Sequence, residues 1–558
     1  MKKFPIFLVA LYFTGSVFGQ LTDPIPTDNW AISQIGANSL LSNPYDIAFG
    51  PDGYLWITER TLGDISRFNP ENGTKDLLIK ITNVYSTAGQ DGLLGLVLHP
   101  QFGQNLGNDY VYVAYTYNSG SNVRKLRISR FEYSKTGNNG TLSNETTLIQ
   151  GLPGSNDHNS GRLAIGPDLK LYYSIGDQGN NQFANTCTDI KAQNLPTSTT
   201  DYFSYQGKIL RLNLDGTIPT DNPILNGIKS HVYSYGHRNA QGLVFASNGK
   251  LYSSEHGAKS DDELNIIESG KNYGWPFIAG YNDSQAYNYC NWSLSSSCSS
   301  SNYSDYSCAA GVTALPESSW VVPSNFKEPI ATWGTVPNGF DFQAGCGFVC
   351  WPTIAPSGMD IYEGNLIPGW GKSLITTALK RGRIYRATIT TDGNAIESIT
   401  NPEADGTNDD FEELWYTQNR YRDIIAAPDG LTFYIITDSS GSTSGPSNNS
   451  SIVIQNPGII IKVKFTGTPL SANSLSNNSE IVLVPNPAKS EFQINLSNNQ
   501  ITISKVQIID TNGRIINQIN TNDNTQKIQT ENLKNGLYFV NIFDQNGNKA
   551  TRKLIIAN

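Results

Sequence analysis

The segment FGPDGYLWITER, residues 49–60, holds the pattern that decides the fold: a Gly-Pro-Asp-Gly turn followed by a strand of aromatic and β-branched residues. The same pattern recurs in IGPDLKLYYSIGDQG (165–179), FASNGKLYSSEHG (245–257) and AAPDGLTFYIITDSSG (426–441). Repeated turn-and-strand units with few helical stretches are typical of a β-propeller, in which each blade contributes an inner strand to a central channel. The sequence therefore predicts an all-β fold built around a propeller.

The repeated strands end in polar residues: Glu59-Arg60, Asp177-Gln178, Glu255-His256 and Asp438. If the four units are structurally equivalent, these ends lie on one face of the propeller. Asp and Glu also cap turns, which would give the same residues a purely structural role. We interpret the four strand ends as the rim of a functional site.

The chain has 558 residues, of which 16% are charged, against about 25% in an average soluble domain. Its 51 Gly, 27 Pro and 11% aromatic residues favour turns and aromatic strands over long helices. The net charge of −9 gives no general attraction for phosphate backbones or anionic lipid and argues against nucleic-acid binding. An anionic ligand would have to be held by a local cluster of cations.

The first 19 residues read as a secretory signal peptide, with a basic start at Lys2 and Lys3 and an apolar stretch from 4 to 13. This stretch is too short to span a bilayer, so we expect the mature protein to be soluble outside the cytoplasm. The six cysteines then become candidates for disulfides, and only Cys346 and Cys350 form an obvious local pair. Their C-x3-C spacing also fits zinc, but the absence of a second cysteine or histidine pair nearby favours the disulfide.

A Ser- and Asn-rich stretch, residues 467–480, is typical of a flexible linker and separates a propeller domain (28–466) from a small domain (481–558). The small domain contains short candidate strands at 492–496, 506–510 and 537–543, separated by turn signals, and this predicts a compact β-sandwich. A generic carbohydrate-binding sandwich would have the same pattern.

Basic residues gather in LKRGRIYR (379–386), in NRYRD (419–423) and at Arg238 of GHRN. Because alternate residues of a strand face the same way, Arg420 and Arg422 are predicted to point together. Two parallel guanidinium groups suit a ligand with several carboxylates, although Lys and Arg also protect strand edges from aggregation. His158, directly after Asp157, is a candidate proton acceptor, whereas His99 and His237 are expected in the core.

The segment 253–283 combines carboxylates with a Gly-, Pro- and Ala-rich backbone. Asp261, Asp262, Glu263 and Asp283 offer hard oxygen ligands, and backbone carbonyls could complete the six to eight oxygens that Ca²⁺ prefers. The ligand order of an EF-hand is missing, so a plain acidic surface loop remains an alternative.

Taken together and in this order, several motifs resemble the soluble pyrroloquinoline quinone (PQQ)-dependent glucose dehydrogenases of the glucose/sorbosone dehydrogenase family. These motifs are GQDGLLGLVLHPQF (89–102), DHNSGRLAIGPDLKLYYSIGDQGNNQ (157–182), YSYGHRNAQGLVF (233–245), SDDELNIIESGKNYGWPFIAGY (260–281), CWPTIAPS (350–357), LKRGRIYR (379–386) and NRYRDIIAAPDGL (419–431). The resemblance covers residues 43–465. It implies a six-bladed propeller with PQQ at the mouth of the channel, Ca²⁺ on the quinone, further Ca²⁺ near the interface of a homodimer, and electrons that pass to an external acceptor.

The resemblance also implies roles for individual residues. His158 is the expected general base, oriented by Asp157, and the expected sugar contacts are Gln90, Gln182, Asp177, Trp351 and Phe348. The residues expected to hold PQQ are Arg238, Asn239, Thr353, Lys380, Arg420, Arg422 and Asp438. The catalytic Ca²⁺ would take the backbone carbonyls of Gly257 and Ala258, and structural Ca²⁺ would take Asp262, Glu263, Tyr273, Ala279, Tyr281, Asp283 and Glu317.

Two departures from the family pattern bear on the site. The family's glucose enzyme has Pro at the position of Ala258, which leaves a carbonyl ligand available in both cases. It has an aromatic hydroxyl where Phe348 stands, so sugar preference is expected to differ. The resemblance predicts oxidation of a glucose-like aldose to its lactone, with a calcium-dependent propeller lactonase and a non-catalytic surface glycan-binding protein as the alternatives.

The small domain resembles the C-terminal sorting domain of type IX secretion substrates. The matching phrases are VPNPAKSEF (484–492), VQIIDTNGRII (506–516), NLKNGLYFVNIF (532–543) and TRKLIIAN (551–558). This resemblance implies recognition by the type IX machinery of a Gram-negative bacterium and a product that is secreted or attached to the cell surface.

Overall fold

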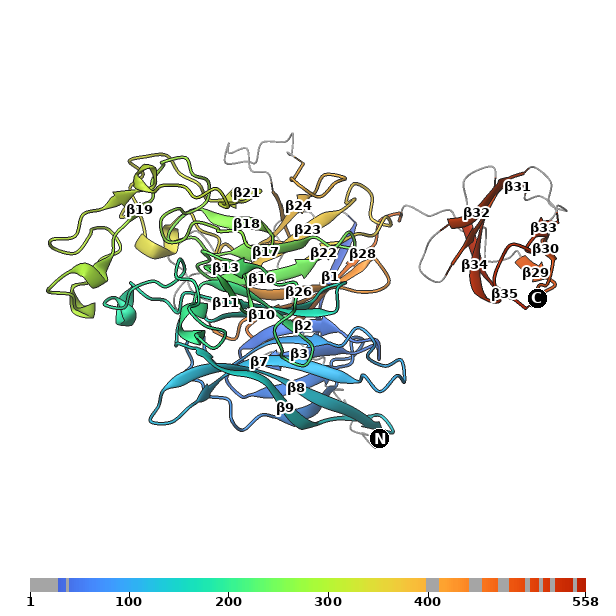
Figure 1. Cartoon of the computed structure of the whole chain (residues 1–558), viewed down its shortest axis with the longest axis horizontal. Coiled ribbons are helices and arrows are strands. Elements are labelled where there is room, and N and C mark those ends of the chain that lie inside the picture. Colours follow the sequence, from blue (N-terminus) through green and yellow to red (C-terminus); the bar gives the residue numbers. More distant parts are fainter. Residues whose placement is uncertain are drawn as a thin grey trace, which may run out of the picture. The chain divides into compact units, whose positions relative to one another are not determined.

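The computed structural model describes residues 29–36, 40–397, 411–440, 454–469, 481–496, 502–510, 515–521, 527–544 and 549–557. The predicted signal peptide and residues 470–480 of the predicted linker lie outside these ranges. The chain divides into two compact units, Met1–Gly364 with Trp370–Gly467 and Asn365–Gly369 with Thr468–Asn558, and Figure 1 shows both. No helix in the described part of the chain is long and apolar enough to cross a membrane.

The described residues of the first unit form six four-stranded antiparallel sheets, the blades of a propeller, which we number in chain order. Blades 1 to 3 consist of β2 (Pro44–Phe49), β3 (Leu55–Glu59), β4 (Asp64–Phe68) and β5 (Lys75–Lys80); β6 (Leu93–Leu98), β7 (Tyr110–Asn118), β8 (Arg124–Thr136) and β9 (Asn139–Pro153); and β10 (Ser160–Ile165), β11 (Lys170–Ile175), β12 (Lys208–Asn213) and β15 (Val232–Tyr235). Blades 4 to 6 consist of β16 (Ala240–Phe245), β17 (Leu251–Glu255), β18 (Asp262–Ile267) and β21 (Ala331–Trp333); β22 (Pro356–Tyr362), β23 (Ser373–Ala378), β24 (Ile384–Thr388) and β25 (Glu412–Leu414); and β26 (Tyr421–Ala426), β27 (Thr432–Thr437), β28 (Ile460–Phe465) and β1 (Trp30–Ile35).

Short elements occupy the loops between these strands. They are the two-residue strands β13 (Ile224–Leu225), β14 (Ile228–Lys229), β19 (Asn288–Tyr289) and β20 (Leu315–Pro316), and the 3₁₀ turns η1 (Phe183–Asn185), η2 (Tyr202–Tyr205), η3 (Trp292–Leu294), η4 (Ser300–Asn302), η5 (Glu317–Ser319) and η6 (Gly347–Cys350). Three disulfides link these loops: Cys187–Cys298, Cys290–Cys308 and the predicted Cys346–Cys350.

The repeated sequence pattern forms the turn between the first and second strands of blades 1, 3, 4 and 6, together with the second strand. In each repeat the Asp or Asn side chain accepts a hydrogen bond from the backbone N–H two residues on, as Asp52 does from Tyr54 and Asp168 from Lys170. This Asx-turn reverses the chain through a hydrogen bond between residues close in sequence, so it needs no contact with distant residues. The pattern therefore specifies the tight hairpin on which each of these four blades is built.

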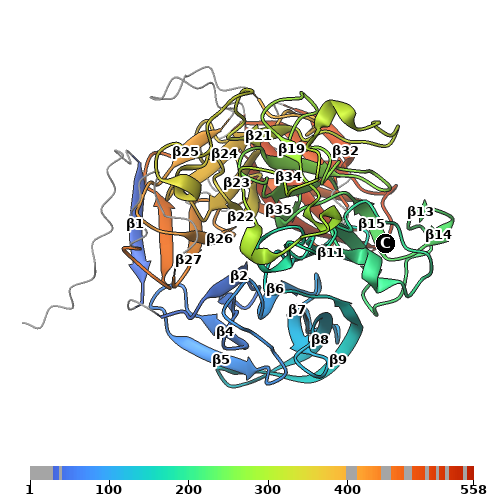
Figure 2. The same ribbon diagram turned by 90° about the vertical axis from the view of Figure 1, so that its left-hand side faces the viewer.

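The first strands of the six blades, β2, β6, β10, β16, β22 and β26, pack against one another in a closed ring. In Figure 2, β2, β6, β22 and β26 lie near the centre and β1, β5 and β9 lie at the periphery. Each of the six first strands shifts register against its second strand near its start. Such bulges bend a strand sharply and leave backbone groups without a partner in their own sheet.

Side chains of neighbouring blades satisfy some of these backbone groups. Asp46 accepts a hydrogen bond from Leu96 N of the next blade, at 3.0 Å, and Asp423 accepts one from Ile47 N, also at 3.0 Å. The Arg162 guanidinium lies between both carboxylates, with Nη1 2.9 Å from Asp46 Oδ2 and 2.6 Å from Asp423 Oδ2. One buried cation thus joins blades 1, 3 and 6 at the centre of the propeller.

The ring closes through the two ends of the propeller sequence. β1 pairs antiparallel with β28, from Trp30 opposite Phe465 to Ile35 opposite Ile460, and so becomes the outer strand of blade 6. The Trp30 ring contacts the rings of Trp370, Trp415 and Phe465 at 5.0–5.3 Å. The structure confirms the predicted six-bladed propeller.

The second unit contains a three-stranded sheet and a four-stranded sheet around one apolar core, as predicted for a small β-sandwich. Its strands are β29 (Ile481–Val484), β30 (Glu491–Leu496), β31 (Ile503–Ile509), β32 (Ile515–Asn520), β33 (Ile528–Gln529), β34 (Gly536–Asp544) and β35 (Lys549–Ile556).

We predict that Arg162→Met destabilises the propeller by about 3–5 kcal/mol, because two buried carboxylates then lose their counter-charge. Burial already raises the pKa of Asp46 to about 7. The loss should therefore be larger at pH 8 than at pH 5, where protonation removes the uncompensated charge. Tryptophan fluorescence during denaturant unfolding measures this unit alone, since all nine Trp lie at or before position 415.

Lys80→Met is the control for this change, because Lys80 forms an ion pair with Asp64 and is 54% exposed. We expect this variant to lose less than about 1 kcal/mol. Equal losses in the two variants would contradict a special role for the central ion pairs.

Candidate functional site

The residues that the sequence predicted as a rim gather at one end of the blades. In each blade the start of the first strand lies opposite the end of the second, as Ser160 lies opposite Ile175 and Ala240 opposite Glu255. Residues just before a first strand and just after a second strand therefore share one face. Those residues include Arg60, Gln90, Asp157, His158, Asp177, Arg238, Asn239, His256, Thr353, Lys380, Arg420 and Asp438.

Asp177, which follows β11, holds the His158 ring. His158 Nδ1 lies 2.8 Å from Asp177 Oδ1, and Asp177 Oδ2 accepts a hydrogen bond from Trp275 Nε1 at 2.9 Å. Asp157, expected to orient the ring, lies 3.8 Å from Nε2 instead. The Asp177 carboxylate favours a proton on Nδ1, which leaves the lone pair of Nε2 free to accept one.

Gln182 and Gln90 surround the open side of this histidine. Gln182 Nε2 lies 3.2 Å from His158 Nε2 and 3.0 Å from Asp157 Oδ2, while its Oε1 accepts a hydrogen bond from Arg238 Nη2 at 3.3 Å. Gln90 Nε2 donates to Asp157 Oδ1. The structure thus brings the predicted base and its amide neighbours into one connected network.

Several residues of the site have a left-handed backbone although they are not glycine. His158, Gln178 and Asn181 have φ of +39°, +69° and +66°. Such conformations cost energy and persist where the surrounding structure enforces them, commonly at functional sites.

Two arginines before and within β26 converge on Asp438, as their alternation in sequence predicted. Arg422 Nη2 lies 2.7 Å from Asp438 Oδ2 and Arg420 Nε lies 3.4 Å from the same oxygen. Burial acts to raise the pKa of Asp438, but the charges of Arg422, Arg420 and Arg60 outweigh it and hold the pKa below its usual value. Three guanidinium groups around one carboxylate leave a surplus of positive charge for a ligand.

Several buried polar atoms of the site have no hydrogen-bond partner within the described residues. The donors among them are Arg238 Nε, Asn239 Nδ2 and Arg422 Nε, and the others include His256 Nε2 and Asp438 Oδ1. An unpaired buried polar group costs about 1–3 kcal/mol, so the three unpaired donors are suited to a ligand with several carboxylate or carbonyl oxygens.

Lys380, at the end of blade 5, is fully buried and donates from Nζ to Trp351 O at 2.5 Å. Burial, together with the charge of Arg381, lowers the pKa of Lys380 to about 7. An anion bound beside this amine would restore its positive charge.

Thr353 and Asp262 connect the CWPT segment to the loop after β17. The Thr353 hydroxyl donates to Asp262 Oδ2 at 2.7 Å, and Asp262 also accepts from Ile354 N and Gly257 N. Both side chains, expected to contact PQQ and Ca²⁺, are thus already engaged with protein partners. Trp351 is buried, while the Phe348 ring is 46% exposed and offers no polar group to a sugar.

The remaining carboxylates expected at Ca²⁺ form a partly buried acidic group. Burial, with a smaller contribution from the charge of Asp283, raises the pKa of Asp261 to about 6 and that of Glu317 to about 7. Glu263 accepts from Gly280 N and Glu317 accepts from Ala279 N, which ties the group to the backbone around Tyr281. The Tyr273 hydroxyl, in contrast, donates to Ile266 O, so only its backbone is available.

No set of three or more His, Cys, Asp or Glu side chains within the described ranges is arranged to hold a metal ion by itself. A cation at the acidic group would therefore need backbone carbonyl ligands as well, and the family resemblance implies Ala279 as one of them.

A cleft of about 570 Å³ opens beside the histidine and shares Gln182 and Arg238 with the site. Its remaining lining includes the aromatic residues Trp275, Tyr287, Tyr289, Tyr303 and Phe342. Its volume lies within the range of small-molecule sites, about 300–1,000 Å³.

Two residues of the site were not assigned roles from the sequence. Trp275 donates to Asp177 and its ring lies 5.3 Å from the Arg238 guanidinium carbon. His256 is half-buried near Arg238, His158 and Arg422, and the loss of solvent around its ring, together with these charges, holds its pKa well below the usual value. The polar end of the repeated strand already pointed to His256, whereas nothing in the sequence linked Trp275 to Asp177. His237 is buried between Glu255 and Ser234, as expected of a core histidine.

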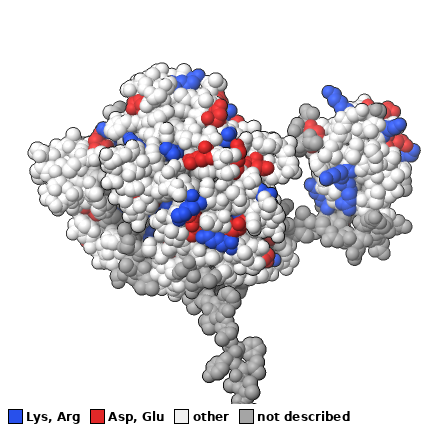
Figure 3. Space-filling view, turned by 90° about the horizontal axis from the view of Figure 1, so that it is seen from below, with Lys and Arg blue, Asp and Glu red and all other residues white. Residues whose placement is uncertain are grey.

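The surface in Figure 3 carries positive and negative side chains close together on the propeller unit, amid large uncharged areas. The cations of the site contribute little to any surface, because Arg238, Lys380, Arg420 and Arg422 are at most 7% exposed. The charge available to an anionic ligand is therefore carried by buried side chains and not by the surface.

Comparison with known proteins agrees with this geometry. Residues 41–308 and 342–444 match the model of the glucose/sorbosone dehydrogenases. The chain is 41% identical over 445 residues to quinoprotein glucose dehydrogenase B of Acinetobacter calcoaceticus, covering 76% of this chain and 90% of the relative. The PQQ-bound aldose sugar dehydrogenase of Streptomyces coelicolor is similar in structure, with a TM-score of 0.52, 25% identity and coverage of 78% and 98%.

The second unit has a separate match. Residues 482–557 match the model of the secretion system C-terminal sorting domain. This match confirms the predicted export of the protein by way of its C-terminal domain. The match of the propeller, together with the identity to the Acinetobacter relative, shows that the chain belongs to the glucose/sorbosone dehydrogenase family.

Proposed function

We propose that the protein is a secreted PQQ-dependent dehydrogenase that oxidises glucose-like aldoses at the anomeric carbon to lactones. The observation that carries the proposal is the position of the His158–Asp177 pair on the same face as Arg238, Asn239 and Arg422, whose buried donors have no partner among the described residues. A proton acceptor close to unpaired donors for an anion suits removal of a proton and a hydride from one alcohol.

The cavity fits PQQ in charge and in hydrogen-bonding capacity. PQQ carries three carboxylates and two quinone oxygens, and Arg420, Arg422 and Lys380 would neutralise the carboxylates. The unpaired donors of Arg238 and Asn239 would then be satisfied by quinone oxygens. Thr353 and Asp438 would act indirectly, by holding neighbouring side chains in place, since each already bonds to one of them.

Bound PQQ, polarised by Ca²⁺, supplies the acceptor for the hydride. His158 Nε2 takes the proton of the anomeric hydroxyl, and the buried Asp177 carboxylate stabilises the imidazolium that results. Gln182, Gln90 and Asp157 orient the sugar hydroxyls around Nε2, and Trp351 and Phe348 would border the sugar on the other side. Arg238, next to Gln182, would stabilise the negative charge that develops on a quinone oxygen.

Calcium fits the acidic residues of blade 4. The Gly257 and Ala258 carbonyls would hold the ion at the quinone. A second site would draw on Glu263 and Glu317, whose burial without a nearby cation is unfavourable, and on the exposed Asp283. Asp262 and the backbone at Tyr273, Ala279 and Tyr281 would complete it. We also propose an external electron acceptor, since the sequence has no C-x-x-C-H haem motif. The family resemblance further suggests a homodimer.

We predict that PQQ and Ca²⁺ together, added to the apoprotein, give glucose-dependent dye reduction and a new quinone absorption. Neither addition alone should suffice. Lactone hydrolysis without PQQ would instead support the lactonase alternative, and sugar binding without turnover would support a glycan-binding protein. A panel of mono- and disaccharides on the reconstituted enzyme then identifies the preferred aldose.

His158→Asn should lower kcat by about 10²- to 10⁴-fold, the usual contribution of a general base. Asp177→Asn should approach this loss, because an amide can donate to Nδ1 and thereby move the proton to Nε2. Asp157→Asn, which alters a side chain 3.8 Å from Nε2, should cost less. Steady-state kinetics of the three variants decides the assignment, and a greater loss in Asp157→Asn would restore Asp157 as the orienting group.

PQQ affinity should fall as pH rises above about 7. The amine of Lys380 has a pKa of about 7 before binding, and a bound carboxylate raises it, so binding above pH 7 must take up a proton. Lys380→Met should bind PQQ more weakly at pH 6 and lose most of this pH dependence. Absorbance titrations at constant Ca²⁺ measure both effects, and an unchanged pH dependence in the variant would exclude Lys380 as its source.

A further inference from the structure

The loop that carries Gln182 is held by a cysteine-rich segment, residues 290–308, that lies outside the catalytic network. We propose that Asn181, held by this segment and by the Cys187–Cys298 disulfide, is a positioning residue that sets Gln182 against His158. The inference rests on the proposed function, because it concerns the residue assigned there as the base.

Gln182 lies in a short irregular loop whose own backbone hydrogen bonds are local, such as those from Asn181 N to Asn185 O and Thr188 O. It precedes η1, a single 3₁₀ turn without a side-chain cap, and its neighbours Asn181 and Phe183 have φ of +66° and +43°. A left-handed backbone on both sides of one residue is stable only where other contacts enforce it. The position of the Gln182 amide thus depends on what holds Asn181 and Phe183.

The Asn181 side chain is bound at both of its polar atoms by the cysteine-rich segment. Asn181 Nδ2 donates to Cys290 O at 2.7 Å, and Asn181 Oδ1 accepts from Trp292 N at 2.7 Å. Trp292 is buried, so this part of the segment is fixed in turn. Because the side-chain amide both donates to and accepts from the backbone of one segment, its orientation is fixed.

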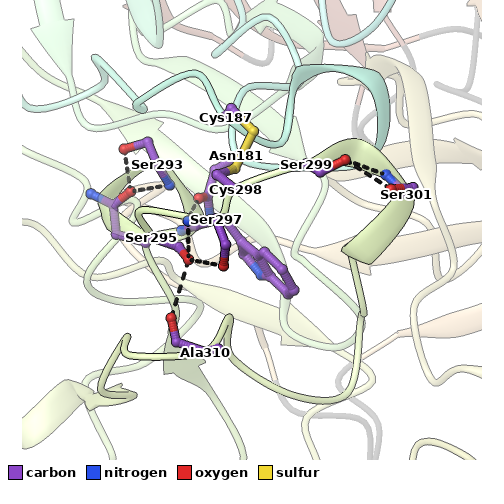
Figure 4. The surroundings of a disulfide bond; sticks show 11 residues. Asn181, Cys187, Ser293, Ser295, Ser297, Cys298, Ser299, Ser301 and Ala310 are labelled. Atoms are coloured by element: carbon purple, nitrogen blue, oxygen red, sulfur yellow. Dashed lines mark hydrogen bonds between the residues drawn. A yellow bond between two sulfur atoms is a disulfide. The ribbon is translucent and has the colours of Figure 1, made fainter.

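Covalent and aromatic contacts support the same connection. The Cys187–Cys298 disulfide joins the two loops next to Asn181, as Figure 4 shows. Asn291 Nδ2 donates to Asp189 Oδ1 at 3.1 Å, and the rings of Phe183 and Tyr303 lie 5.2 Å apart. The Gln182 loop is therefore attached to the segment on both sides of Gln182.

The segment itself depends on cross-links for its order. It contains only the one-turn elements η3 and η4, and serine side chains such as Ser295 and Ser299 make hydrogen bonds mainly within it. The Cys290–Cys308 disulfide closes it into a loop. A segment with so little regular structure can hold Asn181 in one position because the segment is itself cross-linked at several points.

The Gln182 amide contacts His158, Asp157 and Arg238, so a displaced loop would disturb the base and its surroundings together. No hydrogen bond or ion pair among the described residues joins Asn181 or Cys187 to any of these three side chains. Their effect on catalysis would thus pass through Gln182. A displacement of about 1 Å at such a site can reduce rates by about 100-fold.

Asn181→Gly tests the proposal, because glycine adopts the same left-handed backbone and removes only the side-chain hydrogen bonds. We expect kcat to fall by about 10- to 100-fold, with a smaller change in KM. Cys187→Ala/Cys298→Ala should show the same kind of loss. The matched control is Asn226→Gly, an exposed left-handed asparagine in the turn between β13 and β14.

The same substitution is then made in a Gln182→Ala background, where Asn181→Gly should have no further effect on kcat. In the Asn181→Gly apoprotein, hydrogen–deuterium exchange of peptides from 180–189 and 290–300 should be faster than in the wild type. The melting temperature should be the same in both. A full additional loss in the Gln182→Ala background would overturn the proposal, as would Asn181→Gly kinetics equal to those of the control. If the wild-type protein oxidises no sugar with PQQ and Ca²⁺, the proposed function fails, and the exchange data still test the attachment of the loop.

Discussion

The ion pairs that Arg162 forms at the centre of the propeller are the interactions on which the remaining architecture depends. Six bulged first strands meet there, and their bends leave backbone groups that no strand of the same blade can satisfy. Asp46 and Asp423 supply acceptors for neighbouring blades, and Arg162 makes the burial of these two carboxylates tolerable. The starts of the first strands, where His158, Arg238 and Arg420 lie, are fixed as a result.

The site adds a second layer of charge to this arrangement. Below it one guanidinium, Arg162, lies between two carboxylates, whereas at the mouth the charges of Arg60, Arg420 and Arg422 act on one carboxylate, Asp438. Carboxylates outnumber cations in the central layer, whereas cations outnumber carboxylates at the mouth. This contrast explains how an acidic protein can hold an anionic cofactor without an exposed basic surface.

Local patterns made much of the fold and part of the site predictable. The Asx-turns at Asp52 and Asp168 depend on residues two positions apart, so the sequence reveals them directly. The repeated motif does not occur in the corresponding segments of blades 2 and 5, residues 99–109 and 363–372, so those turns were found only in the structure. Arg420 and Arg422 were paired correctly because strand alternation is local. The partner of His158 was not, since a left-handed backbone turns the ring from adjacent Asp157 to Asp177, and Trp275 reaches that carboxylate from a distant part of the chain. The pairing of Cys187 with Cys298 depends on tertiary contacts in the same way.

The pairing of β1 with β28 has a consequence for the timing of folding. The two strands are separated by nearly the whole propeller sequence, so blade 6 stays incomplete until residues 460–465 have been synthesised. Contacts this distant in sequence form slowly and leave strand edges exposed in the meantime. The sorting domain begins soon after β28, and the final blade and the export signal therefore become available at almost the same moment in the life of the chain.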